Sequence, residues 1–170
     1  MPLRQLSLYS LIRYSTGAEE ENMSDDAEIK IVCLAASYQA FGMVVDFLAD
    51  SMPFGTFELS EIAPVLRGQL KHSHNLAALR GDVMVGYAGW LLTTVAIGTE
   101  WMENRAILSP MTAEDSDAAA LTIFASDDRG ATTRLIRGAR ELNIGRRVFF
   151  KRGYDGQMKP GRKATVLNAT

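Results

Sequence analysis

The sequence predicts an α/β fold of the α+β type, in which helices flank a mixed, mostly antiparallel sheet. Three observations support this prediction. Apolar residues recur at helical spacing through residues 27–68, two strand-like runs follow on either side of residues 80–82, and a strand–helix–strand pattern occupies residues 118–153. A strand that is followed by a helix and a further strand indicates a crossover connection within one sheet.

The first part of the chain is predicted to be helical. Polar residues 24–26 offer N-caps for a helix over residues 27–50, which Gly42 divides or kinks. The segment 51–57 contains a proline and a glycine, and these mark a loop. A second helix is predicted over residues 58–68.

The second part is predicted to be richer in strands. Residues 69–79 and 83–92 read as the two strands of an antiparallel hairpin. A short helix or loop is expected around Trp101. The remaining predicted elements are a buried strand over 118–126, a helix over 127–142 with Ala131, Leu135, Ala139 and Leu142 on one face, a strand over 146–153, a turn over 154–163 and a last strand over 164–168.

Length and composition indicate one compact domain. The chain has 170 residues, of which 47% are hydrophobic and 22% charged, which is ordinary for a globular protein. Because residues 19–28 are acidic and polar, residues 1–26 are expected to form a disordered extension and residues 27–170 a single domain.

Cysteine usage and hydropathy indicate a cytoplasmic protein. Cys33 is the only cysteine, so no disulfide forms within the chain, and a buried structural thiol is expected. Polar residues interrupt the apolar start of the chain, which argues against a signal peptide. No apolar run reaches the roughly 18 residues of a membrane span.

The charges are divided unevenly along the chain. Residues 1–128 hold 7 Lys/Arg and 18 Asp/Glu, a net charge of −11, whereas residues 129–170 hold 11 Lys/Arg and 2 Asp/Glu, a net charge of +9. The basic part either docks an acidic partner protein or complements the acidic part of the same molecule. Nucleic acid is a weaker alternative because aromatic platforms are few, and a homodimer remains open.

The segment "SDDRGA" precedes the predicted helix over 127–142, where a helix N-terminus can bind an anion. Arg129 and Gly130 suit a phosphate, but Asp127 and Asp128 would repel it. The two aspartates are more typical of a helix N-cap and first turn. A phosphate cradle for a nucleotide cofactor is therefore disfavoured, and no bound cofactor is expected.

His72 and His74 lie at i and i+2, which places both on one face of the predicted strand. No third ligand has matching spacing, so a metal site is not expected. Either imidazole is a candidate general base, and a surface pair without a function is the alternative.

The order of elements matches that of the GNAT acyltransferases, and several segments resemble one family of that type. "AFGMVVDFLADS", "IAPVLRGQL", "VGYAGWLL" and "LSPMTAEDSDAAALTIFASDDRG" resemble, in this order, segments of the RTX toxin-activating lysine acyltransferases. The resemblance covers roughly residues 40–150. It implies a GNAT-like fold and transfer of a fatty acyl group from acyl carrier protein to a lysine of an acceptor protein.

The resemblance and the motifs described above together give a set of candidate site residues. The substrate-binding candidates are Ser51, Trp90, Arg129, Gly130, Arg134 and Arg137, and the basic segment 129–163 would dock the carrier. The catalytic candidates are His72, His74, Asp127 and Asp128.

The chain departs from the family pattern in two places. The family has a catalytic histidine shortly after the serine that matches Ser51, and this chain has none there. The family also has a catalytic aspartate on the strand where this chain has Phe124. A catalytically inactive relative that binds a carrier or partner protein is therefore the alternative.

Overall fold

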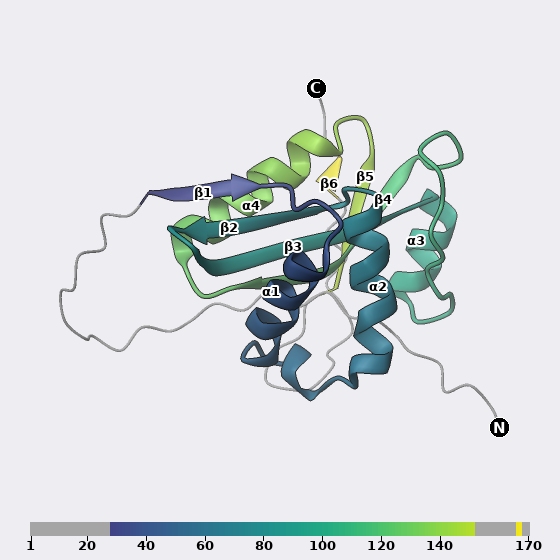
Figure 1. Ribbon diagram of the computed structural model, residues 1–170. Coiled ribbons are helices and arrows are strands. Elements are labelled where there is room, and N and C mark those ends of the chain that lie inside the picture. Colours follow the sequence, from purple (N-terminus) through teal and green to yellow (C-terminus); the bar gives the residue numbers. More distant parts are fainter. Residues whose placement is uncertain (1–27, 152–165, 168–170) are drawn as a thin grey trace.

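The computed structural model describes residues 28–151 and 166–167. In chain order its elements are β1 (Ile29–Val32), α1 (Tyr38–Ala49), the 3-10 turn η1 (Phe54–Thr56), α2 (Leu59–Lys71), β2 (Asn75–Arg80), β3 (Val83–Thr93), α3 (Val95–Met102), β4 (Ala118–Ser126), α4 (Arg129–Leu142), β5 (Arg147–Phe150) and β6 (Val166–Leu167). The strands form one mixed sheet in the order β1-β2-β3-β4-β5-β6 (Figure 1). The α+β class is confirmed. The predicted extension over 1–26 and the turn over 154–163 lie outside the described residues.

The predicted helix over residues 27–50 is wrong in its first part, which is a strand. β1 pairs antiparallel with β2 along all four of its residues. α1 begins only after Ser37, whose hydroxyl accepts a hydrogen bond from the Ala40 N–H at 3.0 Å. A short apolar run fits a strand and a helix equally well, so periodicity alone did not separate them. Gly42 lies within α1 and does not divide it.

Cys33 follows β1 and is exposed, so the prediction of a buried thiol is also wrong. Its Sγ donates a weak hydrogen bond to the Ser73 carbonyl oxygen at 3.7 Å. The chain leaves the sheet at this point, which exposes the side chain.

The predicted hairpin is confirmed, although its first strand begins later than expected. β2 and β3 pair antiparallel and are joined at Gly81, whose φ of 61° lies in the left-handed region that glycine adopts without a steric penalty. α2 continues to Lys71, His72 is its C-cap, and β2 begins at Asn75. The two histidines therefore do not lie on one strand.

The predicted crossover is confirmed as β4–α4–β5. The two strands are parallel, with Ala118 opposite Arg147 and Leu121 opposite Phe150. β4 continues to Ser126. Within the described residues, the second half of β4 thus pairs with β3 alone.

The last predicted elements are also present. The short helix or loop expected around Trp101 is the helix α3, in which this side chain is buried. The strand expected over 164–168 is β6, which pairs antiparallel with β5.

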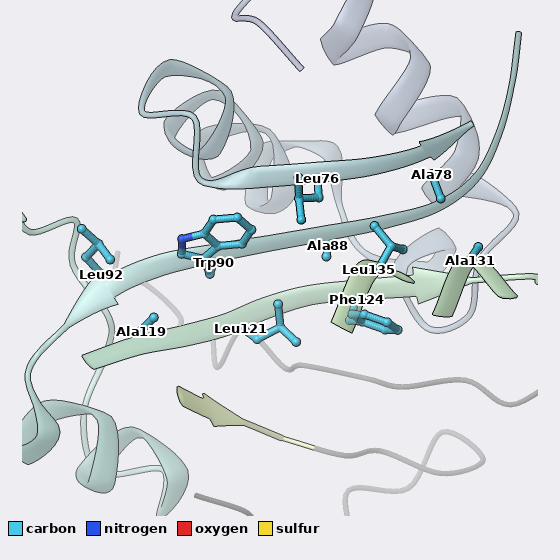
Figure 2. Close-up of a cluster of buried hydrophobic side chains, with 10 residues drawn as sticks. All are labelled: Leu76, Ala78, Ala88, Trp90, Leu92, Ala119, Leu121, Phe124, Ala131 and Leu135. Atoms are coloured by element: carbon cyan, nitrogen blue, oxygen red, sulfur yellow. The ribbon is translucent and has the colours of Figure 1, made fainter. Parts of the chain in front are cut away.

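Helices cover both faces of the sheet. α1 and α2 lie on one face, and α4 crosses the other behind β1, β2 and β3 (Figure 1). Figure 2 shows the core on the α4 side, where Trp90, Leu121 and Phe124 of the sheet share a face with Leu135 of α4. Leu142 was predicted to share the buried face of α4, but at the end of the helix it is 53% exposed.

A β-bulge in β4 changes which side chains face which helix. Gly89 pairs with Ile123 while the next residue, Trp90, pairs with Leu121, so Thr122 is an extra residue. Because of this insertion, Phe124 and Leu121 lie on the same face although they are three residues apart. All nine residues of β4 are buried.

Candidate functional site

The aromatic rings of His72, His74 and Trp90 form a continuous stack. The two imidazole centroids are 5.8 Å apart with an interplanar angle of 29°, and the His74 imidazole lies 6.2 Å from the Trp90 ring at 26°. Trp90 is 3% exposed, His74 is half-buried and His72 is exposed. The stack therefore leads from solvent into the core on the α4 side of the sheet.

The turn between α2 and β2 builds this stack. The backbone N–H of His72 donates to the Gly68 carbonyl oxygen at 3.1 Å, and His72 is the C-cap at which α2 ends. Ser73 has a φ of 56°, which reverses the chain and brings the second imidazole beside the first. The backbone N–H of Trp90 then donates to the backbone carbonyl oxygen of His74 at 3.0 Å.

His74 has the electrostatics of a general base. Its pKa is lowered from the ordinary value of 6.5 by desolvation, by the neighbouring His72 and by the charge of Arg146. The imidazole is therefore neutral at neutral pH and has a nitrogen lone pair available to accept a proton.

Asp127 and Asp128 lie at the start of α4, and their roles differ. Asp128 is the N-cap, as predicted, and its Oδ1 accepts from the Ala131 N–H at 2.7 Å. Its Oδ2 accepts from the Arg80 guanidinium, also at 2.7 Å. Asp127 is exposed and precedes the cap. The protein's own carboxylate thus occupies the anion position at this helix N-terminus.

The four candidate catalytic residues form two separate groups. Arg80, the partner of Asp128, ends β2, and His74 immediately precedes the first residue of the same strand. Six residues of extended chain span about 20 Å, so neither aspartate can orient the imidazole directly.

The arginines of α4 lie along its exposed side. Arg129, Arg134 and Arg137 are exposed and form no ion pair in residues 28–151. Arg134 donates from Nη1 to the Ile29 carbonyl oxygen at 2.5 Å, across to the edge strand β1. Gly130 lies in the first turn, beside the capping carboxylate. Phe149 is buried, so this aromatic ring offers no platform for a nucleobase.

Ser51 is buried at the end of α1. Its hydroxyl donates to the Phe47 carbonyl oxygen at 3.0 Å, one turn back in α1. The side chain therefore finishes a helix, and its oxygen is engaged within its own element.

Three buried polar groups escaped the sequence interpretation. Gln69 of α2 is 0% exposed, accepts from the Tyr87 hydroxyl at 3.0 Å and donates to the Thr122 hydroxyl at 2.9 Å. Burial raises the pKa of Tyr87 above its ordinary value, so the phenol stays protonated. The paired glycines and small residues of "VGYAGW" were a sign of close approach, and Gln69 does fill the space beside Gly89.

From the sequence, Lys151 and Arg146 are predicted only as members of the basic segment 129–163. Lys151 is 5% exposed. Its Nζ lies 4.5 Å from the Trp101 ring centroid and donates a hydrogen bond to Asn104 Oδ1 at 2.7 Å. Desolvation lowers the pKa of Lys151 to about 8. Arg146 lies in the turn before β5, close enough to influence His74.

No protein-family model matches the chain, and no curated protein shows a significant match to it. In the described part of the chain, no cluster of three or more metal-ligating side chains is present. Among the same residues, none of the helices combines the length and apolarity that a membrane crossing requires.

Proposed function

We propose that this protein is a GNAT-like acyltransferase of the cytoplasm, which transfers a fatty acyl group from acyl carrier protein to a lysine amine of a protein acceptor. The observation that carries the proposal is the state of His74. This imidazole is half-buried, stacked on Trp90 and neutral at neutral pH, as an amine-deprotonating base must be.

The proposed step is an addition followed by an elimination. The neutral amine attacks the carbonyl carbon of the carrier-bound thioester, and His74 takes a proton from the attacking nitrogen. The C–S bond then breaks, the carrier thiolate leaves and takes the proton from the His74 imidazolium, and an amide remains on the acceptor. Trp90, predicted to bind substrate, is 3% exposed and packed in the core, so it supports the imidazole from below and offers little surface to an acyl chain.

Two features support a carrier protein as the donor. The exposed arginines Arg129, Arg134 and Arg137 carry no ion pair in the described residues, so they are available to an acidic partner. At the α4 N-terminus, Asp128 already accepts the backbone N–H groups that a cofactor pyrophosphate would need. A donor held by surface charges is consistent with both features.

A binding protein without catalysis is the second candidate, and one observation favours it. Phe124, which stands where the similar family has its catalytic aspartate, is 1% exposed and belongs to the hydrophobic core. If His74 does not act as a base, the same scaffold would bind a carrier through α4 and carry out no chemistry.

Intact-mass spectrometry separates the two candidates. The protein is mixed with acyl-loaded carrier protein and a lysine-bearing acceptor, and the acceptor mass is followed with time. Acyl transfer that is abolished by His74→Gln, and retained in the Asp127→Asn control, supports the acyltransferase. A salt-sensitive complex with the carrier and no mass gain supports the binding protein.

A further inference from the structure

The buried side chain of Asn75 joins the start of β2 to the segment that follows β1. Its Oδ1 accepts from the Leu34 N–H at 2.9 Å, and its Nδ2 donates to the Leu34 carbonyl oxygen at 3.2 Å. Nδ2 also donates to the backbone carbonyl oxygen of Gln69, near the end of α2, at 3.3 Å. Asn75 is fully buried, and these three bonds engage both amide hydrogens and the amide oxygen.

This amide continues the pairing of β1 with β2 beyond the end of β1. Val32, the last residue of β1, pairs with Ala77 of β2. Continued by two residues, the same antiparallel register places Leu34 opposite Asn75. There the side-chain amide bonds the N–H and the carbonyl oxygen of Leu34, as the backbone of a paired strand would. The amide thus fixes the chain at the first residue of β2.

The turn that carries His74 is held at the same place. The backbone N–H of His74 donates to the Gln69 carbonyl oxygen at 2.8 Å, and the Asn75 amide donates to the same oxygen. Directly before His74, Ser73 has a φ of 56°, which is unfavourable for a residue with a Cβ and persists only where surrounding contacts impose it. Asn75 supplies such contacts from α2 and from the segment after β1.

The side chain of Asn75 lies on the opposite side of the sheet from the imidazole of His74. Leu76 and Trp90 belong to the core on the α4 side (Figure 2), whereas Ala77 belongs to the core under α1 and α2. Because neighbouring residues of a strand point to opposite faces, Asn75 shares the face of Ala77. His74 stacks on Trp90, on the α4 side. Asn75 therefore acts on the imidazole through the backbone and does not contact a substrate there.

We propose that Asn75 is a positioning residue that holds the His74 imidazole against Trp90. Its amide fixes the backbone directly after His74, so the ring is presented to a substrate in one orientation. A misplacement of a catalytic group by about 1 Å can lower a rate about 10²-fold. The effect on catalysis rests on the proposed function, whereas the effect on the geometry of His74 does not.

The geometry is tested by NMR without a substrate. The chain has two histidines, so a His72→Gln variant assigns their imidazole signals. In the wild type, the ring current of Trp90 should shift the His74 signals, and the pKa of His74 should lie below 6.5. Asn75→Leu keeps a branched side chain and removes its hydrogen-bonding groups. This variant should abolish the ring-current shift and raise the pKa of His74 toward 6.5, because the imidazole becomes solvated while the charges of His72 and Arg146 are unchanged.

Val44→Ala is the control for a general loss of stability. Val44 is fully buried under α1, in the core on the other face of the sheet, and its truncation should leave the His74 signals and pKa unchanged. If Asn75→Leu does not fold, hydrogen exchange in the wild type provides the test. Both Nδ2 hydrogens of Asn75 should then exchange far more slowly than those of an unprotected amide. Rapid exchange of this amide, or wild-type His74 signals in a folded Asn75→Leu variant, would overturn the positioning role.

The catalytic consequence is measured separately in the transfer assay. Asn75→Leu should lower kcat about 10²-fold and leave KM for the carrier unchanged, because the side chain lies away from the arginines of α4. A His74 ring that is released in Asn75→Leu while kcat stays unchanged would overturn the effect on catalysis. A released ring in this variant, together with no transfer by the wild type, would retain the positioning of His74 and refute the proposed function.

Discussion

Arg80 and Asp128, 48 residues apart in the sequence, form an ion pair at 2.7 Å that connects the end of β2 to the start of α4. The same carboxylate caps α4 through the Ala131 N–H. One side chain therefore fixes both the helix N-terminus and its position against the sheet. This double role explains why the start of α4 is closed to an external anion.

Asp128→Ala should destabilise the protein by about 1 kcal/mol, the typical cost of losing an N-cap side chain. Asp127→Ala is the matched control and should have little effect, because that side chain is exposed. Both are measured by urea unfolding. If Asp127→Ala lowered the unfolding free energy as much as Asp128→Ala, the assignment of Asp128 as the N-cap would be contradicted.

The pH dependence of stability gives a second test of the same carboxylate. Partial burial raises the pKa of Asp128, but hydrogen bonds from the Ala131 N–H and Arg80 outweigh it, so the pKa is lowered below 3.8. The resulting stabilisation is present above the unfolded value and is lost as pH falls through the folded pKa. We expect Asp128→Asn to reduce the acid-induced loss of unfolding free energy. An unchanged acid dependence would show that the carboxylate titrates alike in both states.

Gly89→Ala should destabilise the core, whereas Gly42→Ala should not. A Cβ at Gly89 would lie 2.2 Å from Oε1 of the buried Gln69 side chain, and overpacking of this kind costs about 1–3 kcal/mol. Gly42 lies in α1 with nothing within 4 Å of an added Cβ, so alanine there should stabilise the helix by up to about 1 kcal/mol. Thermal unfolding of both variants provides the comparison, and equal shifts in Tm would argue against the packing described.

Lys151 should make stability increase with pH in the alkaline range. Its pKa is about 8 in the folded protein against 10.5 ordinarily, so the unfolded chain binds more protons between these values. Unfolding free energies are compared at about pH 7.5 and about pH 10 for wild type and Lys151→Met. Between these two pH values the unfolding free energy of the wild type should increase more than that of the variant. An identical increase in both would refute the desolvation of the lysine.

Arg137→Ser should weaken carrier binding by about threefold, in keeping with the loss of one exposed ion pair. Arg67→Ser is the matched control, because Arg67 is an exposed arginine on α2, on the opposite face of the sheet. Isothermal titration at two salt concentrations distinguishes them. An equal loss in both variants would mean that the carrier responds to net charge and not to the α4 surface.

The sequence predicted most elements because their signals are local. The hairpin follows from alternating runs around Gly81, and the α4 cap follows from the aspartates before an amphipathic segment. β1 was missed because four apolar-rich residues next to a helix carry no distinct period. The pairing of β1 with β2 depends on a partner more than 40 residues away, which local patterns do not report.

The sequence predicted which residue types make up the candidate site, but it did not predict how they are arranged. His72 and His74 were recognised as neighbours, but their stacking results from the left-handed Ser73 and not from strand alternation. The separation of His74 from Asp128 depends on the sheet register. The stacking of His74 on Trp90 depends on tertiary packing, and neither property is visible in a single sequence.

The most direct measurement is the rate of acyl transfer from loaded carrier protein to a lysine acceptor between about pH 5 and about pH 8. Because the pKa of His74 is lowered from 6.5, the neutral base should be fully available at neutral pH. We therefore predict that the rate, divided by the fraction of neutral lysine amine, rises with a midpoint below 6.5, reaches a plateau by about pH 8 and disappears in His74→Gln. No transfer at any pH, or transfer that His74→Gln leaves unchanged, would contradict the proposed role of this imidazole.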